Sequence, residues 1–245
     1  MKVIIIGAGL LAKAASSALE RRGATVRMLS RSTGFDVFAG QSPTTLGAAD
    51  AVIEATNVTT QNAKVAHEFF SASTRAAGAV ARATGARHIL VSIINCDHHA
   101  LTGNGYYSGK AEQERIARSE DPDVTIVRTT QWFEFARQML ERMRFGPFAI
   151  VPAMTIQSIA LETVSEVVAD CVTGERIGPL HQVAGRHTTT LWRMTNALTD
   201  RPPLLLPVAV PGRAGRALRD GTLIPGHSVE RIGPSFEEWL ANQNR

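Results

Sequence analysis

A glycine-rich turn separates the first strand-like run of this chain from its first helix-like run. Residues 7–12 read GAGLLA, between the apolar run Lys2–Ile6 and the helical pattern of Leu10–Arg21. In this context Gly7 permits a tight turn, Gly9 lets the backbone approach a pyrophosphate, and Ala12 allows the helix to pack closely on the strand. The helix N-terminus offers free N–H groups to an anion. The turn predicts a dinucleotide site, and the plainer alternative is an ordinary glycine turn.

The first half of the chain alternates short β-type runs with longer helical ones, a pattern typical of βαβ units and a parallel sheet. Most of the β-type runs are rich in Val and Ile, as expected for strands buried on both faces. The predicted strands are Lys2–Ile6, Thr25–Leu29, Ala51–Thr56, His88–Ile93 and Val124–Arg128. The predicted helices are Leu10–Arg21, Asn62–Thr84, a helix from near Tyr107 to about Arg118, Trp132–Arg144 and Leu161–Val172.

These elements predict an α/β fold of Rossmann type, a doubly wound parallel sheet with a small C-terminal lobe that covers the substrate. The chain of 245 residues is long enough for one large α/β domain. We expect a single domain over 1–245, with a dinucleotide-binding core at 1–145 and mostly substrate-lobe elements at 146–245. Six prolines after residue 200 keep the elements of the tail short.

Composition excludes several other classes of protein. No stretch reaches the apolar length of a membrane helix or signal peptide, so we expect a cytoplasmic protein without membrane contact. The two cysteines, Cys96 and Cys171, are far apart in sequence and predict no disulfide framework. The formal charge is +4 and the pI is about 9.5, but no basic run is interleaved with aromatics. We therefore expect no nucleic-acid partner.

The end of the second predicted strand distinguishes between the two dinucleotides. An NAD-specific site normally places Asp or Glu there to hold the ribose hydroxyls. This chain has Ser30-Arg31-Ser32 instead, and a guanidinium flanked by hydroxyls suits a phosphate. NADP is therefore the expected cofactor and NAD the alternative. Arg31 would otherwise stack on adenine or point to solvent.

A second group of residues has the pattern of a proton-transfer site. Ser92 lies near the end of a predicted strand, and Tyr106 and Lys110 follow it, four residues apart in a predicted helix. Residues at that spacing lie one helical turn apart and can face the same way.

These residues resemble the short-chain dehydrogenase/reductase superfamily, in particular its atypical, NmrA-like NAD(P)-binding branch. That superfamily has a glycine motif, a serine and a Tyr-x-x-x-Lys pair in this order. The resemblance extends over nearly the whole chain. It includes His88–Ile93, Gly105–Glu114, Thr125–Phe135, Val183-Ala184-Gly185 and Phe236–Leu240.

The resemblance implies a role for each residue in the reduction of a small carbonyl or quinone. Tyr106 would supply the proton, Lys110 would lower the pKa of the tyrosine and bind the ribose, and Ser92 would hold the substrate oxygen. Tyr107 is the alternative proton donor, because the two tyrosines are adjacent. The expected cofactor-binding residues are Gly7, Gly9, Leu10, Leu11, Ser30, Arg31, Ser32, Thr56, Asn57, Lys110, Thr130 and Gln131.

Two departures from the pattern of the superfamily, the shorter glycine motif and the adjacent Tyr107, accompany this interpretation, together with one alternative function. The glycine motif is one residue shorter than the usual pattern of the superfamily. Some NmrA-like relatives bind the cofactor without turning it over, so a non-catalytic redox sensor with a protein partner is the alternative to an enzyme with a small-molecule substrate. The run Cys96-Asp97-His98-His99 predicts no metal site, since no second cluster of ligands accompanies it.

Overall fold

The structure, a computed structural model, describes residues 1–39 and 46–243. Its central element is a seven-stranded sheet in the order β12-β9-β5-β4-β3-β1-β2. All the strand pairings described within it are parallel, and β1 pairs with both β2 and β3. The seven strands are β1 (Lys2–Ile6), β2 (Thr25–Leu29), β3 (Ala51–Glu54), β4 (Arg87–Ile93), β5 (Thr125–Thr129), β9 (Leu180–Ala184) and β12 (Glu230–Arg231).

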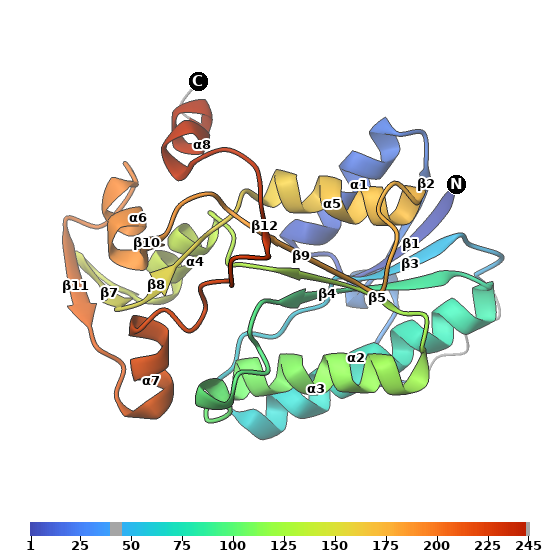
Figure 1. Cartoon of the computed structure of the whole chain (residues 1–245), viewed down its shortest axis with the longest axis horizontal. Helices are drawn as coiled ribbons and strands as arrows, with labels where there is room; N and C mark the ends of the chain where they lie inside the picture. Colours follow the sequence, from blue (N-terminus) through green and yellow to red (C-terminus); the bar gives the residue numbers. More distant parts are fainter. Residues whose placement is uncertain (40–45, 244–245) are drawn as a thin grey trace. The chain divides into compact units, whose positions relative to one another are not determined.

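Four helices cover the two faces of this sheet. Helices α1 (Leu10–Arg21) and α5 (Leu161–Thr173) lie on one face, and α2 (Ala63–Thr84) and α3 (Gly105–Glu120) lie on the other (Figure 1). Strands β1 and β3 are almost wholly buried, because helices pack on both sides of them. This arrangement confirms the predicted doubly wound parallel α/β fold.

The chain forms two compact units. Unit 1 consists of Met1–Ser92, Asn104–Arg128 and Val164–His181, and unit 2 of Ile93–Gly103, Thr129–Thr163 and Gln182–Arg245. The predicted boundary near residue 145, with one domain over the whole chain, stays a prediction.

Unit 2 holds most of the short elements. Strand β7 (Phe148–Pro152) pairs in parallel with β11 (Leu204–Val208) and antiparallel with β6 (Arg144–Phe145), and β8 (Thr155–Ile156) pairs with β10 (Thr189–Thr190). Its helices are α4 (Phe135–Arg142), α6 (Leu191–Ala197), α7 (Gly212–Arg219) and α8 (Phe236–Gln243). The described residues also include the 3₁₀ turns η1 (Arg31–Thr33) in unit 1 and η3 (His99–Leu101) in unit 2.

Helices α2 and α3 approach each other closely because α3 carries two glycines at the contact. A methyl group at Gly109 would lie 2.8 Å from the Cβ of Ala66 and from the ring of Phe70. A methyl group at Gly105 would lie 2.4 Å from the carbonyl oxygen of Gln61. Both distances are below van der Waals contact, so only glycine fits at these positions without movement of α2.

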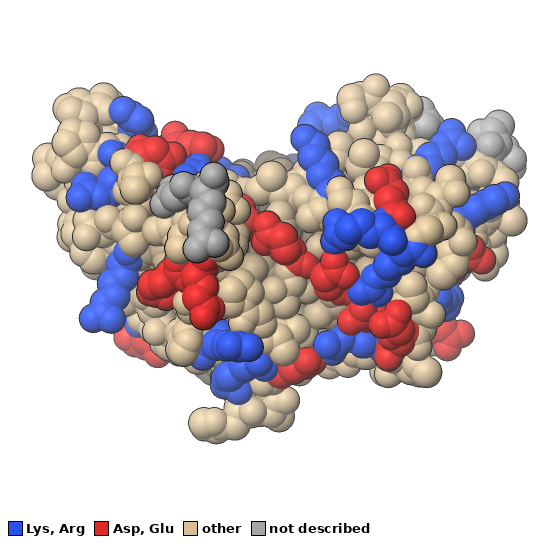
Figure 2. All heavy atoms as spheres, turned by 90° about the horizontal axis from the view of Figure 1, so that it is seen from above, with Lys and Arg blue, Asp and Glu red and all other residues tan. Residues whose placement is uncertain are grey.

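Charged side chains of both signs are mixed on the face shown in Figure 2. In unit 1, the guanidinium of Arg22 lies 2.7 Å from carboxylate oxygens of both Glu166 and Asp170, and Arg21 pairs with Glu166. Basic side chains of α1 thereby meet acidic side chains of α5. No helix in the described part of the chain is long and apolar enough to span a membrane.

Candidate functional site

The turn between β1 and α1 has a backbone that only glycine accommodates at its first position. Gly7 has φ of 129°, and a methyl group there would lie 2.7 Å from the carbonyl oxygen of Ala55, the residue that follows the neighbouring strand β3. Gly9 is the N-cap of α1, and a methyl group at Gly9 would meet no atom within 4 Å. The turn therefore has no room for a side chain at Gly7, whereas the space beside Gly9 holds no protein atom.

The N-terminus of α1 has the properties of an anion site. It lacks a side-chain cap and has no acidic residue in its first turn. The N–H groups of Leu10 and Leu11 are therefore unpaired within the helix and available to a ligand. Ala12 is fully buried, which lets the helix lie close to the sheet. The backbone conformation and packing are those expected of the glycine motif, and dinucleotide binding at this turn stays a prediction.

The end of β2 leads into η1 (Arg31–Thr33) through a short hydroxyl-rich turn. The Ser30 hydroxyl lies 2.8 Å from that of Ser32, and the backbone N–H of Ser30 donates to the Thr33 hydroxyl. The Arg31 side chain is exposed and has no ion pair or hydrogen bond with any residue in the described ranges. Its guanidinium remains available to a ligand.

Helix α3 positions the predicted proton-transfer residues. It begins at Gly105 rather than near Tyr107, because the Asn104 side chain caps it by accepting the N–H groups of Tyr106 and Tyr107. Tyr106 is half-buried, with its ring edge-to-face on Phe70 at 6.0 Å. Tyr107 is 6% exposed. The first tyrosine is therefore the more accessible of the two.

The structure places Lys110 inside unit 1, beneath the first turn of α3. The side chain is 4% exposed, and its ammonium group donates to the Val91 carbonyl at 2.8 Å and to the Gln113 amide oxygen at 2.5 Å. The ammonium also lies 5.1 Å from the centre of the Phe70 ring. Phe70 therefore contacts both Tyr106 and Lys110.

Ser92 lies at the end of β4 and is also buried, with its hydroxyl hydrogen-bonded to Glu114. Glu114 is an acceptor for two nitrogens of Arg128, at 2.8 and 2.7 Å. Burial alone would raise the pKa of Glu114, but Arg128, Ser92 and Arg118 hold it below its ordinary value. Ser92 is thus part of a buried polar network on the α3 side of the sheet.

The remaining predicted cofactor residues lie in two loops. In unit 1, Thr56 follows β3 and its hydroxyl lies 2.5 Å from that of Ser73, while Asn57 is exposed. In unit 2, Thr130 and Gln131 follow β5, and the Thr130 hydroxyl and the Gln131 amide oxygen are buried without a hydrogen-bond partner among the described residues. Unsatisfied buried polar atoms of this kind are expected where water or a ligand binds.

Three chemically notable residues lie outside the predicted set. Glu54 ends β3 as a fully buried carboxylate, and Gln113 links it to Lys110. Glu134, at the N-cap of α4, has a pKa raised to about 7, mainly by burial and further by the nearby Glu162. The sequence could have indicated Glu54, because this glutamate directly follows the apolar run Ala51–Ile53 of a predicted strand. Burial of Glu134 depends on tertiary packing and gives no sequence signal.

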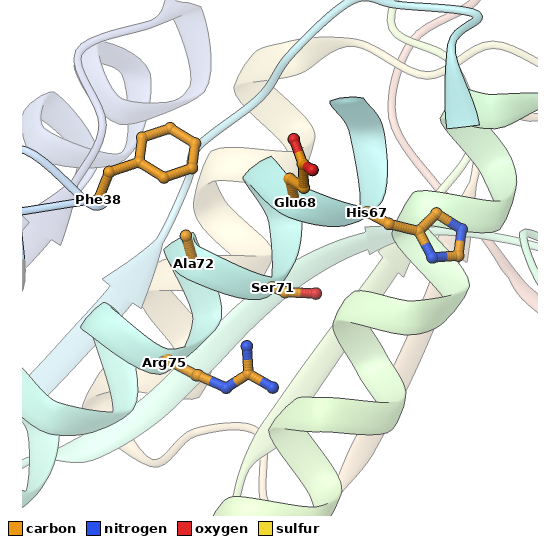
Figure 3. Close-up of a pocket in the computed structure, with 6 residues that line it drawn as sticks. All are labelled: Phe38, His67, Glu68, Ser71, Ala72 and Arg75. Atoms are coloured by element: carbon orange, nitrogen blue, oxygen red, sulfur yellow. The ribbon is translucent and has the colours of Figure 1, made fainter. Parts of the chain in front are cut away.

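Two hollows lie among the described residues, one lined by unit 1 and one lined by unit 2. That of unit 1, about 580 Å³, lies on the outer surface of α2 and is lined by Phe38, His67, Glu68, Ser71, Ala72 and Arg75 (Figure 3). It contains none of the predicted site residues. That of unit 2, about 370 Å³, has an aromatic wall of Phe133 and Phe236 and a basic rim of Arg186, His187 and Arg193. The second is large enough for a small metabolite.

The histidine-rich run after β4 has local structural functions. The His98 ring accepts the N–H of Ala100 and packs against His99 at 4.4 Å. Within residues 1–39 and 46–243, no three His, Cys, Asp or Glu side chains are grouped to hold a metal ion.

No protein-family model matches the sequence, and no curated protein is significantly similar to it. Several solved structures share its fold. A dTDP-4-dehydrorhamnose reductase from Clostridium acetobutylicum superimposes with a TM-score of 0.75 at 15% identity, over 100% of both chains. A UDP-N-acetylglucosamine 4-epimerase from Bacillus cereus gives 0.68 at 15% identity, over 99% of this chain and 94% of that one.

A third similar structure was solved with a cofactor. It is a dTDP-4-dehydrorhamnose reductase from Bacillus anthracis in complex with NADP, with a TM-score of 0.67 at 14% identity, over 98% of this chain and 96% of that one. At these identities the likeness concerns the fold. The chain therefore has the fold of these reductases and of this epimerase, whereas its predicted place in the NmrA-like branch stays a prediction.

Proposed function

We propose that this protein is an NADP-dependent oxidoreductase that reduces a small carbonyl or quinone substrate. The observation that carries the proposal is the β1–α1 turn, where Gly7 fits only as glycine and Gly9 leaves open space at an uncapped helix N-terminus. The fold is also that of a reductase solved with NADP.

The phosphate of NADP distinguishes it from NAD, and Arg31 is the residue proposed to bind it. Its guanidinium has no partner among the described residues, and the Ser30 and Ser32 hydroxyls lie beside it in sequence. A charge-assisted hydrogen bond contributes roughly 1.5 to 3 kcal/mol, which corresponds to about a ten- to hundredfold preference for NADP. Gly9, Leu10, Leu11, Thr56 and Asn57 complete the proposed cofactor site of unit 1. In unit 2, taken by itself, Thr130 and Gln131 are proposed ligand-binding residues because each has a buried polar atom without a partner among the described residues.

In the proposed reaction the reduced nicotinamide supplies a hydride to the carbonyl carbon. Tyr106 donates a proton from its hydroxyl to the carbonyl oxygen, and the half-buried position of Tyr106 favours it over the buried Tyr107. The Lys110 ammonium stabilises the tyrosinate that remains, since it carries positive charge in a buried environment on the same helix. Ser92 is the proposed ligand of the substrate oxygen.

A panel of quinones, aldehydes and ketones, with NADPH oxidation followed at fixed protein concentration, tests this function. Tyr106→Phe should abolish turnover and leave NADP affinity nearly unchanged, whereas Tyr107→Phe should retain activity. Calorimetric titration of NAD and NADP should show a preference for NADP that Arg31→Ala removes. Arg27→Ala, another exposed arginine on β2, is the matched control. Equal affinities of the wild type for both dinucleotides would refute the role of Arg31.

One observation favours a second function, an NADP-binding regulatory protein without turnover. The Ser92 hydroxyl is already bonded to the buried Glu114 and not held ready in an open site. A protein that binds NADP tightly and oxidises NADPH with no member of the panel would fit this alternative. Its partner would then be a protein whose binding changes when NADP is added.

A further inference from the structure

A buried carboxylate lies at the centre of unit 1. Glu54, the last residue of β3, is 1% exposed and receives hydrogen bonds from side chains of three other elements. Ser73 and Thr74 of α2 donate at 2.8 and 3.0 Å, and the Gln113 amide of α3 donates at 2.5 Å. His88 of β4 lies 3.2 Å from its other oxygen. A carboxylate this deep requires hydrogen bonds and a compensating positive charge.

Lys110 provides a positive charge across a single amide group. The Gln113 side chain donates to Glu54 through its nitrogen and accepts from the Lys110 ammonium through its oxygen. The reversed amide would place its NH₂ group against the ammonium, so the two bonds fix its orientation. Burial alone would raise the pKa of Glu54, but His88, Ser73 and Lys110 hold it below its ordinary value.

Glu54 has two basic side chains near it, and one of them, Lys110, reaches it through Gln113. Its titratable neighbours are His88 from β4 and, beyond Gln113, Lys110 from α3, while α2 contributes only hydroxyls. The Nδ1 atom of His88 is buried with no partner in the described part of the chain.

The same carboxylate also reaches the loop after β3. Ser73 donates to Glu54, and its hydroxyl lies 2.5 Å from that of Thr56. One continuous set of side-chain hydrogen bonds therefore runs from Thr56 through Ser73, Glu54 and Gln113 to Lys110. Its two ends are residues that belong to the proposed cofactor and catalytic sites.

We propose that Glu54 is a positioning residue that keeps the Lys110 ammonium charged and oriented through Gln113. This inference rests on the proposed function for its catalytic meaning, but the coupling of Glu54 to Lys110 through Gln113 can be tested without a substrate. Loss of the carboxylate removes a negative charge that is coupled to the buried ammonium through Gln113, and this favours the neutral amine more than in the wild type.

The chain is suited to a direct test because it contains only four lysines, of which Lys2, Lys13 and Lys64 are exposed. In protein labelled with ¹³Cε-lysine, the buried Lys110 signal should be distinct and should remain that of a charged amine at pH 7. Glu54→Gln should lower its titration midpoint by at least about one pH unit. Glu54→Asp, which keeps the charge, should restore most of the midpoint.

Glu112→Gln is the matched control, because it removes the same charge from the same helix where Glu112 pairs with Arg115 near the surface. It should leave the Lys110 midpoint in place. An unchanged midpoint in Glu54→Gln would overturn the proposal. So would a wild-type Lys110 already neutral at pH 7, a result that does not require any variant to fold.

The activity readout separates this inference from the proposed function. If the protein reduces a substrate, kcat should fall at high pH. In Glu54→Gln this fall in the plot of kcat against pH should move to lower pH, together with the Lys110 titration midpoint. A shifted midpoint in a protein that turns over no substrate would support the role of Glu54 and refute the oxidoreductase. A shifted midpoint with no shift in the fall of kcat would refute the catalytic part of the inference.

Discussion

Replacement of Glu134 by Gln should make the stability of unit 2 less dependent on pH. Burial and the nearby Glu162 raise the pKa of Glu134 to about 7 from an ordinary value of 4.5, and its Oε2 atom has no partner among the described residues. Arg137, which would lower this pKa, is also paired with Asp200 at 3.0 Å. The folded protein therefore holds a proton at Glu134 more tightly than the unfolded chain does.

The sign of the effect follows from that difference. The stabilisation is fully present below pH 4.5 and is lost as pH rises through about 7, because unfolding releases a proton in this range. A difference of 7 minus 4.5 pKa units corresponds to about 3 kcal/mol. Since the side chain is only half-buried, solvent screening reduces the value to about 1 to 3 kcal/mol. Glu134→Gln, which cannot ionise, should gain this amount over the wild type at pH 8.

Urea unfolding followed by tryptophan fluorescence is the suitable assay, because Trp132, Trp192 and Trp239 all belong to unit 2 with Glu134. The difference in unfolding free energy between variant and wild type should be near zero at pH 4.5 and should increase up to pH 8. Glu141→Gln, which removes an exposed carboxylate from the same helix, should show no such trend. Parallel curves for Glu134→Gln and the wild type over this range would refute the reasoning.

Three further predictions concern other parts of the chain. Gly185→Ala should destabilise unit 2 by about 1 to 3 kcal/mol in the same urea assay, since its methyl group would clash with the Ser158 carbonyl oxygen. A loss of less than about 1 kcal/mol would contradict this contact. The Cys171 thiol, whose pKa is raised to about 11 by burial, should not react with a disulfide reagent at pH 8 until denaturant is added. Arg22→Ala should cost about 1 kcal/mol or less, and the cost should shrink in high salt, because its ion pairs with Glu166 and Asp170 lie at the surface.

The sequence predicted the parallel core well, because its signals are local. Helix α1 and strands β1 and β2 have the bounds that periodicity and glycine placement indicate, and the fold class is confirmed. Helix α4 was predicted to begin at Trp132 but begins at Phe135. The preceding residues pair with Ile159 instead, since the Phe133 N–H donates to the Ile159 carbonyl and Trp132 forms a bridge to Ile159. Tertiary pairing there outweighs the helical pattern.

The small strands of unit 2 could not be predicted from local patterns. Strand β11 contains Pro207, which normally argues against a strand, yet it pairs in parallel with β7 as an edge strand. The candidate site likewise has one part that local sequence patterns reveal and one part that they do not. The glycine turn was visible because it depends on local backbone conformation, whereas the link from Glu54 through Gln113 to Lys110 joins residues of two elements that are far apart in sequence. Only the fold brings those side chains together.

The close contact of α2 and α3 restricts how the proposed catalytic residues can move. With Gly105 and Gly109 against the backbone of α2, α3 cannot slide along or rotate against its neighbour without a steric clash. Helices α2 and α3, with Tyr106 and Lys110 on α3, are therefore expected to move as one rigid body. Sliding or rotation of α3 would have to carry α2 with it. Hydrogen exchange should accordingly show the two helices opening as a single cooperative unit.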